Sequence, residues 1–198
     1  SLSLMCTHGE FKYTPTRMDV RGMDRFTYSV RDGKNSCSNE AAVYIFIDGS
    51  LRIMPLGDSI TVGSYTVDAP LPGQHVGYRR KLYDHLVAAS EHRFGVEFVG
   101  GLAEGTLADP PARDPRHEGW GGFSAAQVAD NVISWLTGNP PDVILLHIGT
   151  NFFDTSPADI ERILDNIGRW EAENYPVYTF IARIIQTADG SLDVDTFN

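Results

Sequence analysis

The sequence predicts an α/β fold, a three-layer doubly wound parallel sheet, over residues 51–198. Short apolar runs alternate there with stretches of helical periodicity, an order that right-handed crossovers join into a parallel sheet. Two of the apolar runs end in small polar residues, as strands do at the ligand-binding edge of such sheets. The last helix of this fold and the loop before it have no counterpart in the sequence, so we expect the fold to be incomplete at its C-terminal end.

Four apolar runs are the expected strands, at residues 51–56, 96–99, 143–148 and 177–185. Each is short, is followed by turn or helix signals, and is rich in branched side chains. They predict the order strand, helix, strand, helix, strand, helix and strand.

Start and stop residues define three helices between these runs. We expect the first helix to close at Gly95. The second begins at Ser124, which forms a capping box with Gln127. The third has Ser156 as its cap and Pro157 in its first position. The expected apolar stripes are Tyr78, Leu82, Leu86 and Ala89 in the first helix, Val128, Val132 and Leu136 in the second, and Ile160, Ile163, Leu164 and Ile167 in the third.

Residues 1–49 contain three strand-like runs, at residues 11–15, 26–30 and 42–47. This segment resembles the C-terminal strands of bacterial Ig-like and cadherin-like tandem repeats, which are extracellular spacers. A complete sandwich has about seven strands, so we expect a partial β-sandwich here. The alternative is a hairpin extension of the domain that follows.

Both cysteines, Cys6 and Cys37, lie in this first segment. An exported protein could pair them, but spacing alone does not bring two Cα atoms within bonding distance, so we treat them as unpaired. Neither has the spacing of a metal site, and we expect neither metal nor cofactor.

The motif Gly57-Asp58-Ser59 ends the first apolar run. A strand that stops at glycine and hands over to serine can present the hydroxyl at the carboxyl edge of the sheet. The plainer interpretation is a strand-to-helix turn in which Asp58 or Ser59 is an N-cap.

Two later motifs favour the catalytic interpretation. Gly122 lies in a glycine-rich segment before the second helix, and Asn151 closes the motif Gly149-Thr150-Asn151 after the third strand. Ester hydrolysis needs a nucleophile and donors for the oxyanion of the tetrahedral intermediate. Ser59 N–H, Gly122 N–H and the Asn151 amide would supply these donors.

In their order along the chain, these three motifs resemble those of the SGNH hydrolases, the GDSL-like lipase and esterase superfamily. The resemblance covers residues 51–198 and implies a flavodoxin-like fold with Ser59 as the catalytic residue and Ser59, Gly122 and Asn151 as the oxyanion hole. Four further segments are most similar to the acetylxylan-esterase-like branch of carbohydrate esterases: Gly77-Tyr78-Arg79, Phe98-Val99-Gly100, His117-Glu118-Gly119 and Pro141-Asp142-Val143.

The sequence departs from this family at two places. Phe152 stands where the family usually has aspartate, and no histidine follows Asn151, although the family takes its base from an Asp-x-x-His motif there. The expected base is therefore a histidine, with its aspartate, encoded beyond Asn198. The chain does contain one Asp-x-x-His, Asp114 to His117, but it precedes the second motif and we do not expect it to be catalytic.

Side chains beside these motifs are candidates for lining a cleft, with core packing or turn bonding as the alternative. They are Asp58, His117, Glu118, Trp120 and Phe152.

The composition of the chain excludes some classes of binding partner. A formal charge of -10 and a pI near 4.9 argue against nucleic acid and anionic membranes, and no apolar run has the length of a membrane span. We therefore expect an acylated carbohydrate or another small ester as substrate, in an extracellular or cell-surface bacterial protein of unknown oligomeric state. A non-catalytic carbohydrate-binding or adhesion module and a lipase specificity on the same fold are the alternatives.

Overall fold

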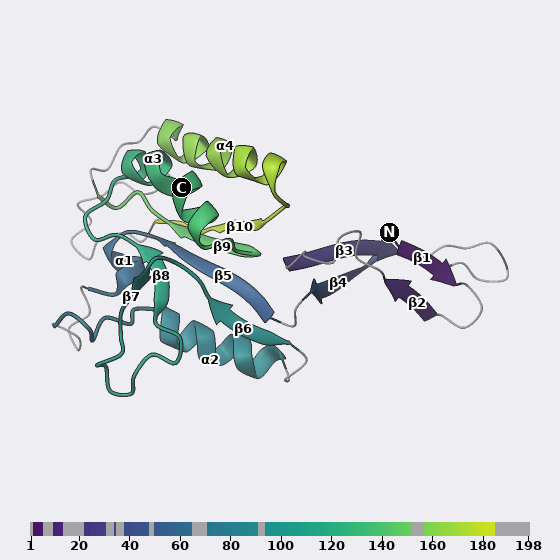
Figure 1. The fold of residues 1–198 in the computed structure, drawn as a ribbon, viewed down its shortest axis with the longest axis horizontal. Coiled ribbons are helices and arrows are strands. Elements are labelled where there is room, and N and C mark those ends of the chain that lie inside the picture. The colour runs from purple at the N-terminus through teal and green to yellow at the C-terminus, as the bar shows by residue number, and fades with distance from the viewer. Residues whose placement is uncertain are drawn as a thin grey trace. The chain divides into compact units, whose positions relative to one another are not determined.

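The computed structural model describes residues 2–5, 10–13, 22–30, 34, 38–47, 50–64, 71–90, 94–151 and 157–184. The chain divides into two compact units, Ser1–Gly49 and Ser50–Asn198, and each is described by itself (Figure 1).

The first unit contains two antiparallel strand pairs. β1 (Leu2–Met5) pairs with β2 (Glu10–Tyr13), and β3 (Gly22–Tyr28) pairs with β4 (Ala41–Ile47). The three predicted strands correspond to β2, β3 and β4, whereas β1 was not predicted. The likeness to an Ig-like repeat stays a prediction, and both cysteines lie outside the described residues.

The second unit is built on one mixed, mainly parallel sheet with the order β10-β9-β5-β8-β7. β5 (Ser50–Gly57) is central: β9 (Val143–His147) lies on one side of it, and β6 (Gly95–Phe98) and then β8 (Arg116–Gly119) lie along the other. These pairs are parallel, as is the pair of β9 with β10 (Tyr178–Ile181). β7 (Leu102–Ala103) runs antiparallel to β8.

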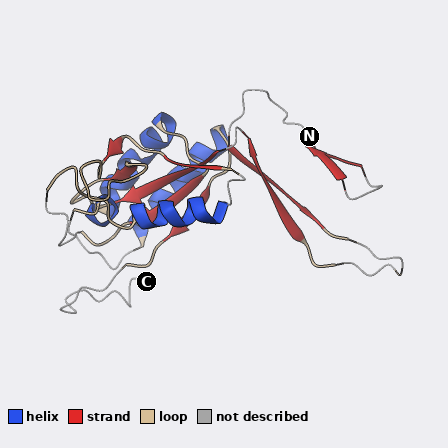
Figure 2. Cartoon of the chain, turned by 90° about the horizontal axis from the view of Figure 1, so that it is seen from below, coloured by secondary structure: helices blue, strands red, loops and turns tan. Residues whose placement is uncertain are grey.

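Helices cover both faces of this sheet (Figure 2). α3 (Ala125–Gly138) and α4 (Ala158–Glu173) pack on the face that carries Met54 and Ile144, and α2 (Arg79–Ser90) packs on the face that carries Ile53. The short helix α1 (Ser59–Val62) follows β5 directly. These three layers confirm the predicted α/β fold.

The capping box between Ser124 and Gln127 is confirmed, and so are the buried stripes of α3 and α4. The first helix was predicted too long, because α2 ends at Ser90 and Gly95 begins β6. Ala89, expected in the buried stripe of that helix, is exposed. α4 begins at Ala158 with Pro157 as N-cap, one residue later than predicted, and Ser156 lies outside the described residues.

Candidate active site

Three parallel strands end in register at Gly57. Gly57 is the partner of Gly119 in β8 and of His147 in β9, so the residues that follow all three strands emerge at one edge of the sheet (Figure 1). Trp120, the first residue after β8, donates its N–H to the Gly57 carbonyl oxygen at 2.8 Å. The sheet therefore brings the chain segments of Ser59, Gly122 and Asn151 to the same edge.

Ser59 is the first residue of α1, and Asp58 is the N-cap of this helix. The Ile60 N–H donates to Asp58 Oδ1 at 2.9 Å and so holds the turn. This is the N-cap that the plainer interpretation of the motif predicted. The first N–H groups of a helix have no acceptor within the helix, so the Ser59 N–H can serve an oxyanion. Ser59 is 6% exposed.

Gly122 lies in a β-turn that follows β8. The Phe123 N–H donates to the Trp120 carbonyl oxygen at 3.1 Å, and Gly122 is the third residue of this turn with a φ of 82°. That left-handed conformation is typical of a type II turn and favours glycine. Gly122 is exposed, so its main chain is accessible to a ligand.

Asn151 is tied to this same turn. Its Nδ2 donates to the Phe123 carbonyl oxygen at 3.0 Å. An amide nitrogen carries two hydrogens, so one N–H holds the side chain in place and the second remains for a ligand. The neighbouring Phe152 lies outside the described residues.

The Asp58 carboxylate lies in a buried polar cluster with His147 and Thr150. Burial raises the pKa of Asp58, and the Ile60 N–H, the nearby His147 and the Thr150 hydroxyl oppose the rise. The Thr150 hydroxyl lies beside the carboxylate without completing a hydrogen bond to it. Among the described residues, Asp58 Oδ2, Thr150 Oγ1 and both ring nitrogens of His147 have no hydrogen-bond partner. The cluster adjoins the ends of β5 and β9.

Asp114 and His117 do not form a catalytic dyad. Asp114 Oδ2 accepts the Phe98 N–H at 2.7 Å, and its Oδ1 accepts from Arg116 Nε at 3.2 Å. His117 Nδ1 accepts the Gly119 N–H at 3.0 Å. Burial, with the neighbouring charge of Arg79, lowers the pKa of His117 to about 3. This histidine is a neutral structural residue.

The expectation that Asp58, His117 and Glu118 line a cleft is corrected, because each is 0% exposed. Glu118 accepts the Gly101 N–H at 2.6 Å and Trp120 Nε1–H at 2.9 Å, and burial raises the pKa of its carboxyl. It thus orients the indole of Trp120, which is partly exposed.

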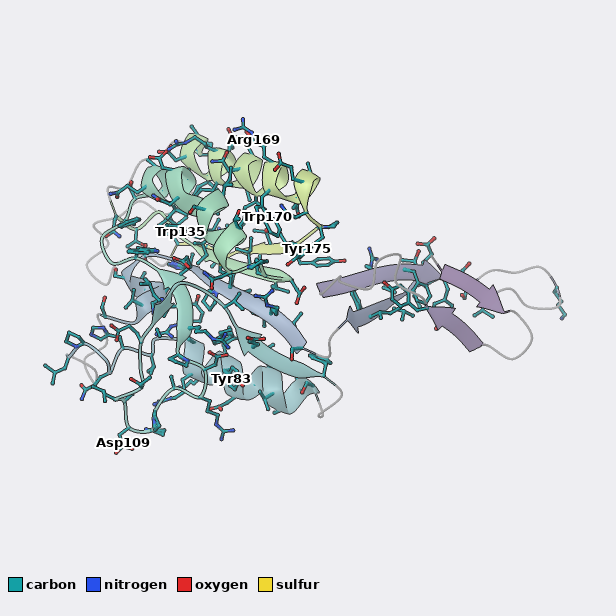
Figure 3. The ribbon with its side chains drawn as sticks, viewed as in Figure 1. Tyr83, Asp109, Trp135, Arg169, Trp170 and Tyr175 are labelled. Atoms are coloured by element: carbon teal, nitrogen blue, oxygen red, sulfur yellow. The ribbon has the colours of Figure 1, made fainter. Side chains whose placement is uncertain are left out.

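Trp120 belongs to an aromatic cluster with Phe123 and Trp135. Its ring stacks on that of Trp135 at a centroid distance of 5.6 Å and on that of Phe123 at 5.3 Å. Trp135 lies on α3 (Figure 3). Phe123 and Trp135 also pack against the core of the second unit. The cluster fixes the turn that contains Gly122 against α3.

One residue of this region was missed by sequence reasoning as a contributor to the site. Arg79 is 1% exposed, and Arg79 Nε donates to the Thr61 carbonyl oxygen of α1 at 2.9 Å. Its signal was present in the motif Gly77-Tyr78-Arg79, which carried the family resemblance but received no role.

Within the part of the chain that the structure describes, no group of three or more His, Cys, Asp or Glu side chains could hold a metal ion. The described helices include none with the length and apolar character to cross a membrane.

Three solved structures are similar to this chain. A family 3 carbohydrate esterase from Clostridium thermocellum matches with a TM-score of 0.58 and 25% identity, over 75% of this chain and 67% of its own. An acetyl esterase mutant determined with an acetate ion matches with a TM-score of 0.58 and 22% identity, over 74% of this chain and 68% of its own. A family 3 carbohydrate esterase from Talaromyces cellulolyticus matches with a TM-score of 0.57 and 22% identity, over 75% and 69%. No family model and no curated protein matches the chain.

Proposed function

Because this chain belongs to the SGNH hydrolase superfamily of ester hydrolases, we propose that Ser59 is its nucleophile and that it removes acetyl groups from carbohydrate. The observation that carries the proposal is the register of β5, β8 and β9 at Gly57, together with the bond from Asn151 to Phe123. Serine, glycine and asparagine motifs from distant parts of the chain thereby share one sheet edge.

In the proposed reaction, Ser59 Oγ forms a bond to the ester carbonyl carbon while its proton passes to a general base. The carbonyl oxygen becomes an oxyanion that accepts from Ser59 N–H, Gly122 N–H and the second N–H of Asn151. Collapse of this intermediate breaks the bond to the alcohol, which takes up the proton, and water then hydrolyses the acyl-serine.

The base in this proposal is a histidine with its aspartate, as the superfamily's Asp-x-x-His motif implies. The sequence contains no histidine after His147, and Asp114 and His117 bond to other partners. We therefore assign neither Asp114 nor His117 as the base.

The substrate class rests on the comparisons. The similar structures include carbohydrate esterases of family 3 and an acetyl esterase, which supports an acetyl group on a sugar as the ester. A net charge of -10 suits a neutral carbohydrate better than an anionic ligand.

A rate assay tests this function. The chain is incubated with acetylated xylo-oligosaccharide in imidazole buffer, since free imidazole can serve as the general base. We expect wild type to release more acetate than Ser59→Ala. The control is Ser64→Ala, which changes a nearby serine and should keep the wild-type release. If the chain instead binds the oligosaccharide, and wild type releases no more acetate than Ser59→Ala, the protein is a binding module and the proposal is overturned.

We further propose that residues 1–49 form part of an extracellular repeat and that the protein is exported by a bacterium. The support is the sequence likeness of the predicted strands to such spacers. Antibodies against the chain are expected to label intact producing cells, whereas labelling only after lysis would contradict export.

A further inference from the structure

Arg79, the first residue of α2, is a buried arginine whose hydrogen bonds go to main-chain carbonyl oxygens. Its Nε donates to Thr61 at 2.9 Å, and its Nη2 donates to Val62 at 3.0 Å. The same guanidinium donates to the carbonyl oxygens of three loop residues, His75 at 2.8 Å, Pro115 at 2.9 Å and Glu104 at 3.3 Å. One side chain thus connects α1 to three separate loop segments.

Thr61 and Val62 are the last two residues of the helix that begins with Ser59. Carbonyl groups at the end of a helix lack partners within the helix, and a cation there also interacts favourably with the helix dipole. A four-residue helix does not hold its shape alone, because nucleation is unfavourable. Here Asp58 caps the first turn and Arg79 binds the last carbonyl groups, so buried side chains hold both ends.

We infer that Arg79 is a positioning residue for Ser59: its guanidinium binds the C-terminal carbonyl groups of α1 and thereby fixes the main chain that carries the nucleophile. This inference rests on the proposed function, which gives Ser59 a reaction. Arg79 does not touch the reacting atoms in this account.

The planar shape of the guanidinium lets Arg79 donate to several carbonyl oxygens at once. Arginine presents five donors in fixed directions, whereas lysine places three donors on a single nitrogen. Arg79→Lys therefore keeps the positive charge and loses the simultaneous bonds to Thr61, His75 and Pro115. Arg79→Gln is the second variant, in case the lysine side chain disturbs the fold.

The first readout is hydrogen exchange, which does not depend on activity. The amides of Gly63 and Ser64 both donate to the Ser59 carbonyl oxygen, at 2.8 and 3.2 Å. In Arg79→Lys we expect these two amides to exchange about 10-fold faster, while the amide of Val128 in α3 is unchanged. A general loss of stability would accelerate all three.

The second readout is acylation of Ser59 by 4-nitrophenyl acetate in imidazole buffer, measured per folded molecule. We expect the rate at saturating ester to fall by about 10-fold or more in Arg79→Lys, with the half-saturating concentration unchanged. The matched control is Arg116→Lys, because Arg116 donates to Asp114 and Glu97 rather than to α1. We expect it to change neither readout.

The outcomes separate the two proposals. Unchanged acylation and unchanged exchange in Arg79→Lys and Arg79→Gln would overturn the positioning role and leave the proposed function standing. A wild-type chain that never acylates Ser59 would overturn the proposed function, and the positioning role falls with it even where exchange at Gly63 and Ser64 rises.

Discussion

A Cβ atom on Gly57 would overlap the carbonyl oxygen of His147, because β5 and β9 approach closely where the two residues are register partners. The same atom would lie 2.6 Å from the Thr61 hydroxyl of α1. Glycine at this position therefore lets the strand that leads to Ser59 pack directly against the strand that leads to Asn151.

Gly57→Ala is expected to lower the free energy of unfolding by about 3 kcal/mol, because main-chain atoms of β9 must move to admit the methyl group. Gly121→Ala is the matched control, since a Cβ atom there meets nothing within 4 Å. Urea unfolding of both variants checks this. Equal stability of the two would show that β5 and β9 are not packed as described.

Asn151→Ala is expected to slow acylation of Ser59 by about 3 kcal/mol in transition-state free energy, on the order of 100-fold. The control is Asn166→Ala, because Asn166 Nδ2 also donates to a main-chain carbonyl oxygen, that of Ala129, but between α4 and α3. We expect the control to affect stability rather than the rate per folded molecule. An unchanged rate in Asn151→Ala would remove this amide from the oxyanion hole.

Acid is expected to destabilise the second unit through His117. Its pKa in the folded chain is about 3, well below 6.5, so only the unfolded chain binds a proton there between these values. The free energy of unfolding should therefore fall by about 1.4 kcal/mol per pH unit as the pH drops from 6.5 toward 3.

His117→Asn removes this contribution and keeps an acceptor for the Gly119 N–H. Asp58 and Glu118 titrate in the opposite sense, because burial raises the pKa of each carboxyl. The test is therefore the difference between wild type and variant, with exposed His85→Asn in α2 as the control. An equal acid slope in wild type and His117→Asn would contradict the prediction.

Asp58→Asn is expected to preserve or raise the melting temperature, because asparagine still accepts the Ile60 N–H and carries no buried charge. Burial raises the pKa of Asp58, so its carboxyl costs stability as the pH rises from the unfolded pKa of 3.8 through the higher pKa of the folded chain, and the advantage of asparagine grows over that interval. Asp58→Ala is expected to lose about 1 kcal/mol with the cap. An asparagine variant as unstable as the alanine variant would show that the charge itself is needed.

The sequence predicted the elements whose signals are local. Two examples are the capping box at Ser124 and the apolar stripe of α4, which contains the buried Ile163 and Ile167. Each can be recognised from a few neighbouring residues. Ser59, Gly122 and Asn151 were singled out because each lies in a recognisable motif next to a predicted strand or helix.

The sequence did not predict β8, since its residues are Arg116, His117, Glu118 and Gly119 and lack apolar alternation. This strand exists because it pairs with the end of β5 and buries its polar side chains with partners. Arg79 was missed for a similar reason: arginine is rarely fully buried, and its five acceptors come from segments far apart in the chain.

The central claim is that Ser59 is a nucleophile. The most direct test incubates the chain with 4-nitrophenyl acetate in imidazole buffer and locates the acetyl group by mass spectrometry of the digested protein. We predict an acetyl group on Ser59 in wild type and in Ser64→Ala, and none on residue 59 in Ser59→Ala. Acetylation confined to surface lysines, equal in wild type and Ser59→Ala, would contradict the account.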